Sequence, residues 1–348
     1  MKSLVIREHG DADAISVEER ELPEPSAGRV RLRVRAVGLN HLDVWVRRGV
    51  EGHRFPLPLV PGSDVVGDVE AVGPGVVPTL VGRLAALQPA ISCGRCGRCL
   101  DGQENLCAKY AIRGEGMDGG CREALITSVD DLLLLPSHIN PIEAAAFPLS
   151  ALTAWHMLVE RAQVKPHEIV LVLAGASGVG SAAIQIAHSL GARVFATAGS
   201  SENRELALEL GAEAAFAHGP DDPFHRALRA ATDKHGADVI IEHVGEATWG
   251  RSLKALAWGG RLVTCGATSG HRAEVDLRAL FFKQQSLLGS TMGTRAGMLH
   301  LWEGFCEGHY RANVGATLPM SRLAEAHKLL EERSVLGKVV VEQDLHTL

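Results

Sequence analysis

Four cysteines lie within one short segment of the chain and could bind a metal ion together. They form a C-x2-C-x2-C-x7-C array: Cys93, Cys96, Cys99 and Cys107. The two-residue gaps let successive sulfur atoms turn toward one ion, and Gly94 and Gly97 permit the tight backbone that this requires. Four thiolates complete a tetrahedral zinc shell, so that no position stays open for water or substrate. The array predicts one structural zinc ion in a lobe of residues 91–110.

Other assignments of these cysteines are weaker. Two disulfides would suit the spacing, but the cytoplasm keeps thiols reduced. An iron–sulfur cluster also takes four thiolates and remains an alternative. The other cysteines stand alone in the sequence and are expected to behave as small apolar side chains: Cys121, Cys265 and Cys306.

A glycine-rich turn is the second signal for chemistry. It follows the apolar run IVLVLA and reads Gly175, Ala176, Ser177, Gly178, Val179, Gly180. Glycines at such a turn let the backbone approach a pyrophosphate, whose charge faces the positive end of a helix that we expect from about Val179. Ser177 occupies the usual second glycine, so the pattern alone is weak. A hydrolase elbow, G-x-S-x-G, fails here because its last glycine is replaced by Val179.

The elements around this turn strengthen the interpretation. Strand-like runs recur at 169–174, 193–198, 214–217, 238–243, 261–266 and 286–291. Helical stretches such as 181–190 and 202–210 separate them. Strands that alternate with crossover helices predict a doubly wound parallel sheet of the Rossmann type, with a dinucleotide bound at the glycine turn.

The end of the second predicted strand indicates which dinucleotide is bound. An acidic residue there would accept hydrogen bonds from the ribose 2′-hydroxyl and repel a 2′-phosphate. This chain has Ala198 and Gly199 instead, followed by hydroxyl groups of Ser200 and Ser201 that can donate to a phosphate. Arg204 lies one helical turn further on and can pair with it, unless it only pairs with a neighbouring Glu. We therefore expect NADP(H) in preference to NAD(H).

Length and composition agree with a two-domain α/β enzyme. The 348 residues have a net charge of -6, which argues against nucleic acid or an anionic membrane as the main partner. Charge appears in the amino-terminal segment already at Arg7 and Glu8, too early for the apolar run of a signal peptide. We therefore expect a cytoplasmic chain. The uncharged stretch 169–187 approaches the length of a membrane helix, but its central glycines favour a turn.

Several motifs together resemble the medium-chain dehydrogenase/reductase superfamily along the whole chain. They are the four-cysteine lobe and the segments 36–49, 61–76, 145–158, 171–187 and 287–293. The resemblance is to the zinc-type alcohol dehydrogenase architecture, with several motifs closer to the quinone oxidoreductase branch. It implies a GroES-like, β-rich catalytic domain of residues 1–138 and 295–348, with GKVVVEQ returning as one of its strands. A Rossmann domain of residues 139–294 would lie between, with the active site in the cleft, in a homodimer or homotetramer.

The departures from the family concern a second, catalytic zinc. The resemblance places its ligands at Asn40, Ser63 and the region of Ser150, with Asp64 for a nearby Glu. Amide and hydroxyl groups are poor zinc ligands compared with thiolate and imidazole. The proton-relay position is apolar, at Leu42. We expect no catalytic zinc, although a residual site formed by Asp64 and His41 stays open.

Without a catalytic metal the most plausible reaction is hydride transfer to an activated acceptor. Zinc lowers the pKa of an alcohol, and an unassisted alkoxide is too basic near neutral pH. Transfer to a quinone or enone is easier because the negative charge is delocalised. We therefore expect an NADP(H)-dependent reductase of quinones, enones or other activated carbonyls. The alternatives are a zinc-dependent alcohol dehydrogenase and, in another class, a non-enzymatic NADPH-binding protein.

The resemblance also implies candidate residues for the site. Asn40 would face the nicotinamide and substrate, His41 would lie near the pyrophosphate, and Asp43 would hydrogen-bond within the loop or orient His41. His53 is a second candidate proton donor, and Trp45 stands where relatives often have Tyr. Other matching segments would line the nicotinamide half: Thr153, Val244, Gly245, Gly266, Ala267, Thr291 and Met292. Each of these could equally be an ordinary packing residue.

Overall fold

The protein is described here by a computed structural model that covers residues 1–347. Its chain forms two compact units, one of Met1–Leu149 with the segment that begins at Thr294, the other of Ser150–Gly293. The domain limits expected from the sequence, 138/139 and 294/295, stay a prediction. Among the described residues, no helix has the length and apolar character needed to cross a membrane.

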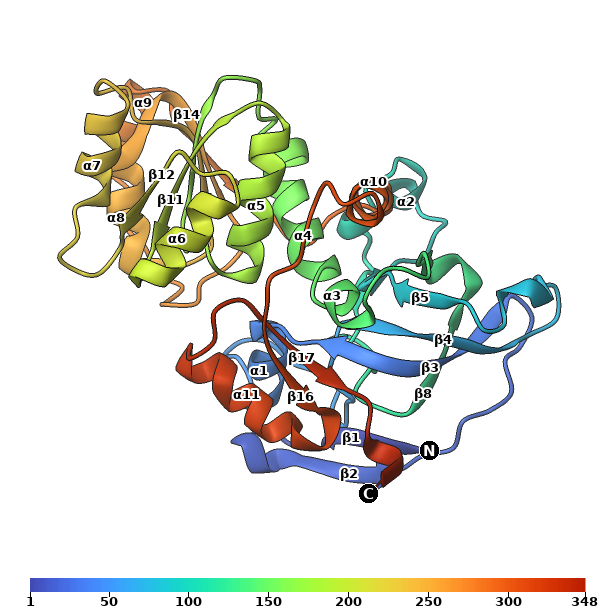
Figure 1. Ribbon diagram of the computed structural model, residues 1–348. Coiled ribbons are helices and arrows are strands. Elements are labelled where there is room, and N and C mark those ends of the chain that lie inside the picture. Colours follow the sequence, from blue (N-terminus) through green and yellow to red (C-terminus); the bar gives the residue numbers. More distant parts are fainter. Residues whose placement is uncertain (348) are drawn as a thin grey trace. The chain divides into compact units, whose positions relative to one another are not determined.

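The first unit is built on a mixed, mainly antiparallel sheet (Figure 1). Its strands follow the order β16-β17-β3-β4-β5-β9, and β8 also pairs with β3. The bounds are β3 Arg29–Gly38, β4 Asp64–Val72, β5 Leu84–Leu87, β8 Ala124–Ser128, β9 Leu132–Leu134, β16 Val314–Pro319 and β17 Lys338–Glu342. β17 pairs antiparallel with β3, which confirms that the segment near the carboxyl end returns as a strand of this sheet.

Smaller elements complete this unit. Its short strands are β1 Lys2–Ile6, β2 Ile15–Glu19, β6 Ala90–Ile91 and β7 Ala111–Ile112. Its helices are α1 His41–Arg48, α2 Gly97–Leu100, α3 Pro141–Ala145, α10 Arg295–Cys306 and α11 Leu323–Glu332. Alternation along β3 buries Val30, Leu32 and Val34 in the core and directs Arg33 and Arg35 to solvent, as the period of two predicts.

The second unit is the predicted Rossmann fold. All six predicted strands form one parallel sheet in the order β12-β11-β10-β13-β14-β15. Their bounds are β10 Ile169–Val172, β11 Arg193–Ala198, β12 Ala214–Ala217, β13 Ala237–Glu242, β14 Leu256–Thr264 and β15 Ser286–Gly289. The order reverses between β10 and β13, which is where such sheets bind nucleotides, at the carboxyl ends of the strands.

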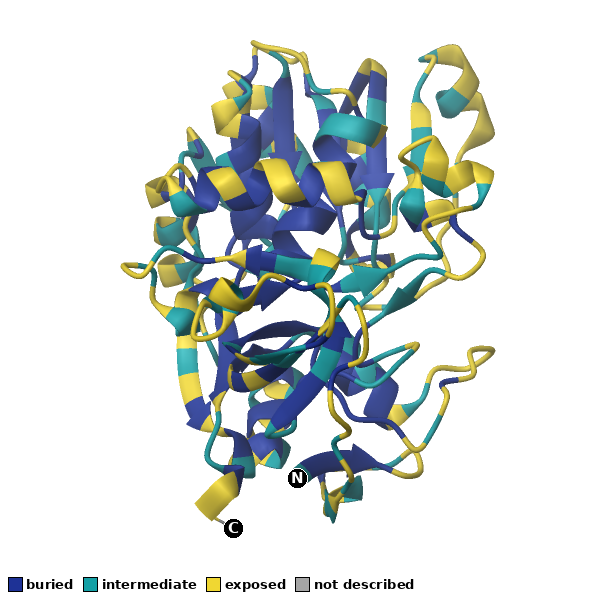
Figure 2. Ribbon diagram, turned by 90° about the vertical axis from the view of Figure 1, so that its right-hand side faces the viewer, coloured by how far each residue is buried: buried dark blue, intermediate teal, exposed yellow. Residues whose placement is uncertain are grey.

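Helices connect these strands. They are α5 Gly178–Ser189, α6 Ser201–Glu209, α7 Phe224–Ala231, α8 Glu246–Ala255 and α9 Leu277–Phe282. α4 Pro148–Trp155 leads into the unit and continues as a wider helical turn, His156–Arg161. The central strands are buried along their length, whereas the helices alternate between buried and exposed residues (Figure 2). This is the burial pattern of a sheet covered on both faces.

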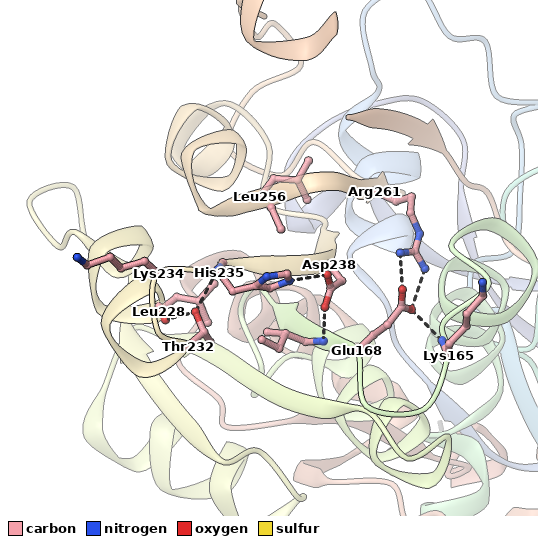
Figure 3. A network of polar contacts seen from close by, with 12 residues as sticks. Lys165, Glu168, Leu228, Thr232, Lys234, His235, Asp238, Leu256 and Arg261 are labelled. Atoms are coloured by element: carbon pink, nitrogen blue, oxygen red, sulfur yellow. Dashed lines mark hydrogen bonds and ion pairs between the residues drawn. The ribbon is translucent and has the colours of Figure 1, made fainter. Parts of the chain in front are cut away.

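A polar network ties together the amino ends of the strands (Figure 3). Glu168, just before β10, pairs with Arg261 of β14 at 2.7 Å. Asp238 of β13 accepts the backbone N–H of Ile169 at 2.8 Å and contacts His235 at 2.7 Å. This edge is opposite to the edge that binds nucleotides. The network therefore holds strands in register and leaves the chemistry to the other edge.

Candidate functional site

The four predicted zinc ligands come together in the structure. Cys93 follows β6, Cys96 precedes α2, Cys99 lies within α2, and Cys107 ends the lobe. Their sulfur atoms all lie within 4.8 Å of one another. Two of the separations are 3.8 Å (Cys93 to Cys99) and 3.5 Å (Cys96 to Cys99). Tetrahedral zinc with Zn–S bonds of about 2.3 Å needs sulfur atoms roughly 3.8 Å apart, so the cluster fits a structural zinc ion.

Local backbone groups favour the thiolate form at one ligand. The pKa of Cys93 is lowered to about 6, first by the backbone N–H groups of Arg95 and Cys96. The backbone N–H of Lys109 also points to the sulfur of Cys107, at 3.3 Å. Thiolate is the form that binds metal, and N–H groups around the sulfur atoms are part of what orients such ligands.

The glycine turn joins β10 to α5, as predicted. Ser177 is the N-cap of α5, and its hydroxyl accepts the backbone N–H of Gly180 at 3.1 Å. A Cβ on Gly180 would lie 2.2 Å from the carbonyl oxygen of Ala174, so the chain passes itself too closely there for any side chain. The helix begins at Gly178, one residue before the predicted start. Its first N–H groups can bind an anion.

The neighbouring strand, β13, supports this turn. Its next residue, His243, lies with Nε2 at 3.0 Å from the hydroxyl of Ser177. The fully buried carboxylate of Glu242 accepts the backbone N–H groups of Val244 and Gly245 at 2.8 and 3.1 Å. Hydroxyls of Thr248 and Ser252 also donate to Glu242, which fixes the loop after β13. The carboxyl ends of β10 and β13 therefore present one continuous, hydrogen-bonded surface.

The carboxyl end of β11 carries the residues predicted to select the cofactor. Ala198 is buried, whereas Gly199 and Ser200 are exposed. Ser200 caps α6 by accepting the N–H of Asn203, and Ser201 and Arg204 lie in its first turn. Apart from its two chain neighbours, the nearest described atom to a Cβ built on Gly199 is Nε2 of His218, at 3.9 Å. This end of the strand has open space beside it.

An acidic residue also lies within this turn. The pKa of Glu202 is lowered by its own backbone N–H first, and then by the hydroxyls of Ser200 and Ser201 and the charge of Arg204. Glu202 therefore competes with a bound phosphate for the same donors. This carboxylate is the structural feature that weakens the expectation of NADP(H).

The residues predicted to line the nicotinamide half lie near the ends of their strands. Thr153 belongs to α4, and its hydroxyl reaches the sulfur of Met292 at 4.0 Å. Met292 has φ 48°, in the left-handed region. Gly266 and Ala267 follow β14, and Thr291 follows β15. The structure gathers these residues at the carboxyl edge of the Rossmann sheet, the edge that carries the glycine turn.

In the first unit, Asn40 lies in a cluster of charged groups. Its side-chain Nδ2 donates to Oδ2 of Asp64 at 3.0 Å. Lys338, the first residue of β17, donates from Nζ to Oδ1 of Asn40 at 2.6 Å and to Oδ2 of Asp64 at 3.2 Å. Oδ1 of Asp64 accepts the backbone N–H of Leu149 at 2.7 Å. Asp64 is fully buried and Lys338 only 6% exposed, so an ammonium group and a carboxylate form a buried ion pair beside Asn40.

Asp43 acts on the backbone of the same loop. Its carboxylate accepts the N–H of Asn40 at 2.8 Å and the N–H of Gly62 at 2.8 Å. Burial raises the pKa of Asp43 to about 6, against the lowering effect of these two N–H groups and of Lys338. Its contacts are those of a residue that ties the backbone at Asn40 to the backbone at Gly62.

The two candidate histidines have different surroundings. His41 begins α1, and its pKa is lowered by burial first and then by Arg333 and Lys338, which favours the neutral form of its ring. His53 is exposed, with its ring 4.4 Å from that of Phe55. His41 therefore lies among cations in the protein, whereas His53 lies in an open loop.

The remaining positions where the resemblance places a catalytic zinc and its proton relay are Ser63, Ser150 and Leu42, and they carry no thiolate, imidazole or carboxylate. Ser63 is fully buried, and its hydroxyl has no hydrogen-bond partner among residues 1–347. Leu42 and Ser150 supply an apolar side chain and a hydroxyl. The group of Cys, His, Asp and Glu side chains with metal-binding geometry in the described part of the chain is the four-cysteine lobe.

Comparison with known proteins agrees with both units. Residues 26–137 match the alcohol dehydrogenase GroES-like domain, and residues 178–304 match the zinc-binding dehydrogenase family. A solved structure described as an NAD-dependent alcohol dehydrogenase is 42% identical, with a TM-score of 0.92, over 98% of this chain and 99% of that one. The chain belongs to the medium-chain dehydrogenase/reductase superfamily. It is an NAD(P)-dependent oxidoreductase of the alcohol dehydrogenase and quinone oxidoreductase type.

Relatives in this superfamily divide between the two activities. A quinone oxidoreductase of Rattus norvegicus is 27% identical over 98% of this chain and 97% of its own length. An alcohol dehydrogenase of Geobacillus stearothermophilus is 28% identical over 99% of this chain and 100% of its own length. Overall sequence similarity therefore does not distinguish the two reactions for this medium-chain dehydrogenase/reductase. The residues of its site must be used instead.

Sequence reasoning missed several polar residues of the two units. The sequence predicts Lys338 only as part of a strand, although the charge at the start of the apolar run KVVVE is a signal that could mark it. Glu242 and His243 give a similar signal, because they interrupt the apolar strand DVII at its carboxyl end. In a parallel sheet, polar residues at that end are candidates for a ligand site.

Proposed function

We propose that the protein transfers hydride from NADPH to a quinone, an enone or another activated carbonyl compound without a catalytic zinc ion. The observation that carries the proposal is the buried ammonium group of Lys338, which lies 2.6 Å from Asn40 and 3.2 Å from Asp64. Asn40 and Asp64 are among the positions where the resemblance places the catalytic metal and its surroundings. A metal ion there would meet the ammonium group of Lys338, the amide of Asn40 and the hydroxyl of Ser63, and the carboxylate of Asp64 is already paired with Lys338.

The roles proposed for the residues of this site follow from the hydrogen bonds and protons that their side chains can donate. When bound, NADPH would supply a hydride, a hydrogen nucleus with two electrons, to an electron-poor carbon of the acceptor. The negative charge that develops on the acceptor's oxygen is stabilised by hydrogen-bond donors held in place beforehand. Asn40 is the proposed donor, Asp43 holds its loop, and His41 or His53 passes a proton from solvent to the oxygen.

The cofactor is proposed to bind at the carboxyl edge of the Rossmann sheet. The pyrophosphate would accept hydrogen bonds at the start of α5, from Gly178, Val179 and Gly180 next to Gly175 and Ser177. Thr153, Val244, Gly266, Ala267, Thr291 and Met292 would line the nicotinamide half. The 2′-phosphate would be bound by Ser200, Ser201 and Arg204.

The preference for NADPH can be tested at Gly199. An Asp there would have open space, since the nearest atom to its Cβ would be 3.9 Å away, whereas an Asp at Ala198 would be buried. We expect Gly199→Asp to shift the ratio of NADPH to NADH affinity toward NADH by at least about tenfold, because a carboxylate repels the 2′-phosphate. Leu208→Asp, on the exposed part of α6, is the control for an added negative charge. An unchanged ratio in Gly199→Asp contradicts the proposed phosphate site.

The main alternative is a zinc-dependent alcohol dehydrogenase that uses NAD. It is favoured by the 42% identity to a structure described as an NAD-dependent alcohol dehydrogenase, and by the carboxylate of Glu202 beside Arg204. Metal analysis separates the two: we expect about one zinc ion per chain, and the alternative requires about two. NADPH consumption with a quinone or enone also separates our proposal from a protein that only binds the nucleotide.

The protein is further proposed to act as a homodimer or a homotetramer. β15 is an edge strand of the Rossmann sheet, and exposed apolar side chains lie in nearby segments: Trp258, Leu277, Phe281 and Phe282, each 63% to 70% exposed. Trp258 and Phe282 contact each other edge to face, with ring centroids 5.4 Å apart. A patch of this kind on an edge strand is suited to a second copy of the chain. Sedimentation of wild type and Phe281→Glu tests it, and a monomeric wild type contradicts it.

A further inference from the structure

Lys338 carries a role that the superfamily assignment does not give. Its side chain extends from the start of β17 and is buried against polar groups of two other segments, the turn before α1 and the start of β4. Burying an ammonium group is costly unless it is paired and hydrogen-bonded. Asp64 supplies the opposite charge, and Asn40 supplies a second acceptor. Asn40 and Asp64, which both accept hydrogen bonds from Lys338, are thus also hydrogen-bonded to each other.

This arrangement fixes which way the amide of Asn40 faces. Lysine has donors and no acceptor, so the atom of Asn40 that faces Nζ must be the carbonyl oxygen. An ionised carboxylate has acceptors and no donor, so the atom that faces Asp64 must be the nitrogen. A rotation of the amide by half a turn would place N–H against ammonium and oxygen against carboxylate. Both contacts would become repulsive.

This geometry leaves one of the two side-chain N–H bonds of Asn40 available to a ligand. Nδ2 carries two hydrogens, and within residues 1–347 the acceptor found for it is Asp64. Asn40 is partly exposed, unlike Asp64 and Lys338, which are buried. The amide is therefore the member of the cluster that a small molecule can reach, and it can offer that molecule only a donor.

We propose that Lys338 is a positioning residue that holds Asn40 as a hydrogen-bond donor toward the oxygen of the acceptor, in a place where relatives would use a metal ion. The inference rests on the proposed function for the identity of the acceptor. The ammonium charge of Lys338 also lies close to the amide of Asn40. It therefore stabilises negative charge that develops on an acceptor oxygen bound to that amide. Lys338 acts through Asn40 and does not itself touch the acceptor.

Three variants and one control test the proposal through activity. Lys338→Met keeps most of the side-chain length without the charge, Lys338→Arg keeps the charge, and Asn40→Ala removes the donor. Lys328→Met, on the exposed side of α11, is the matched control. We expect Lys338→Met to lower kcat for enone or quinone reduction at least about tenfold, with the Kd for NADPH changed less than about twofold. Lys338→Arg should recover most of kcat.

The double variant separates positioning from general stability. If Lys338 acts through Asn40, then Lys338→Met should cause little further loss of kcat in the Asn40→Ala background. Losses that multiply in the double variant, or an equal weakening of NADPH binding, would overturn the proposal. A merely structural role would damage both backgrounds to the same extent.

A readout without turnover keeps this test independent of the proposed reaction. The side-chain amide resonance of Asn40, assigned by its absence in Asn40→Ala, should exchange its hydrogens with water at least about tenfold faster in Lys338→Met than in wild type. Lys328→Met should leave the rate unchanged. Unchanged exchange in Lys338→Met overturns the role of Lys338. Faster exchange in a protein that reduces no enone or quinone supports that role and contradicts the proposed function.

Discussion

The buried histidine of α11 should make the stability of the first unit depend on pH. His327 is fully buried, and neither ring nitrogen has a hydrogen-bond partner among the described residues. Burial lowers its pKa to about 3, with a further lowering by the buried Arg47. The ring is therefore neutral in the folded protein at pH values where the unfolded chain binds a proton.

The sign and size of the effect follow from the two pKa values. The unfolded state, with a pKa near 6.5, binds more protons than the folded state between pH 6.5 and 3. The titration of His327 therefore leaves the free energy of unfolding unchanged above pH 6.5 and lowers it as the pH falls from 6.5 toward 3. One pKa unit corresponds to about 1.4 kcal/mol, so the loss is about 2 kcal/mol at pH 5 and about 5 kcal/mol below pH 3.

Replacement by leucine removes this titration. We expect the free energy of unfolding of His327→Leu, measured by urea unfolding at constant zinc, to gain about 2 kcal/mol relative to wild type between pH 7 and pH 5. Zinc release and other titrations occur in both proteins and cancel in the difference. His309→Gln, at a side chain that is 68% exposed, is the control and should show no such gain. A difference between His327→Leu and wild type that stays constant from pH 7 to pH 5 would refute the reasoning.

Two further predictions concern the zinc lobe and the glycine turn. Cys96→Ser should lower the zinc content below one ion per chain and lower Tm, while the folded fraction still binds NADPH; metal analysis and calorimetry measure both. Gly180→Ala should raise the Kd for NADPH at least about tenfold, because its Cβ would lie 2.2 Å from the carbonyl oxygen of Ala174 and displace the turn. Gly250→Ala, in α8, should leave nucleotide binding unchanged in the same fluorescence titration, because outside the helix's own backbone no atom of residues 1–347 lies within 4 Å of its Cβ. Normal zinc content in Cys96→Ser, or normal affinity in Gly180→Ala, would contradict these assignments.

Local patterns were enough to predict much of the fold. The six strands of the Rossmann sheet follow from short apolar runs, and β11 and β12 have the predicted limits. β10 and β15 also begin where predicted, whereas the remaining limits shift by a few residues: β10 ends at Val172, two residues before the predicted end, and β14 begins at Leu256, five residues before the predicted start. Strand ends depend on pairing with neighbours, such as Ala237 with Leu256, and local sequence does not contain that information.

Candidate site residues were predictable to different degrees. The four cysteines lie within 15 residues of one another, so spacing alone brings them together. The glycine turn is also local. Lys338, in contrast, is separated from Asn40 by 298 positions, and nothing in either segment indicates the other. A contact of that kind exists only once β17 has paired with β3.

The sequence by itself determined the zinc lobe, the glycine turn and the alternation of strands and helices, because each depends on residues a few positions apart. The tertiary structure alone decided that a lysine from the last strand lies between Asn40 and Asp64. It also placed His243 against the glycine turn, since β13 lies next to β10 in the sheet. Burial and charge pairing between distant segments are properties of the folded chain, and the chemistry proposed for this protein depends on them.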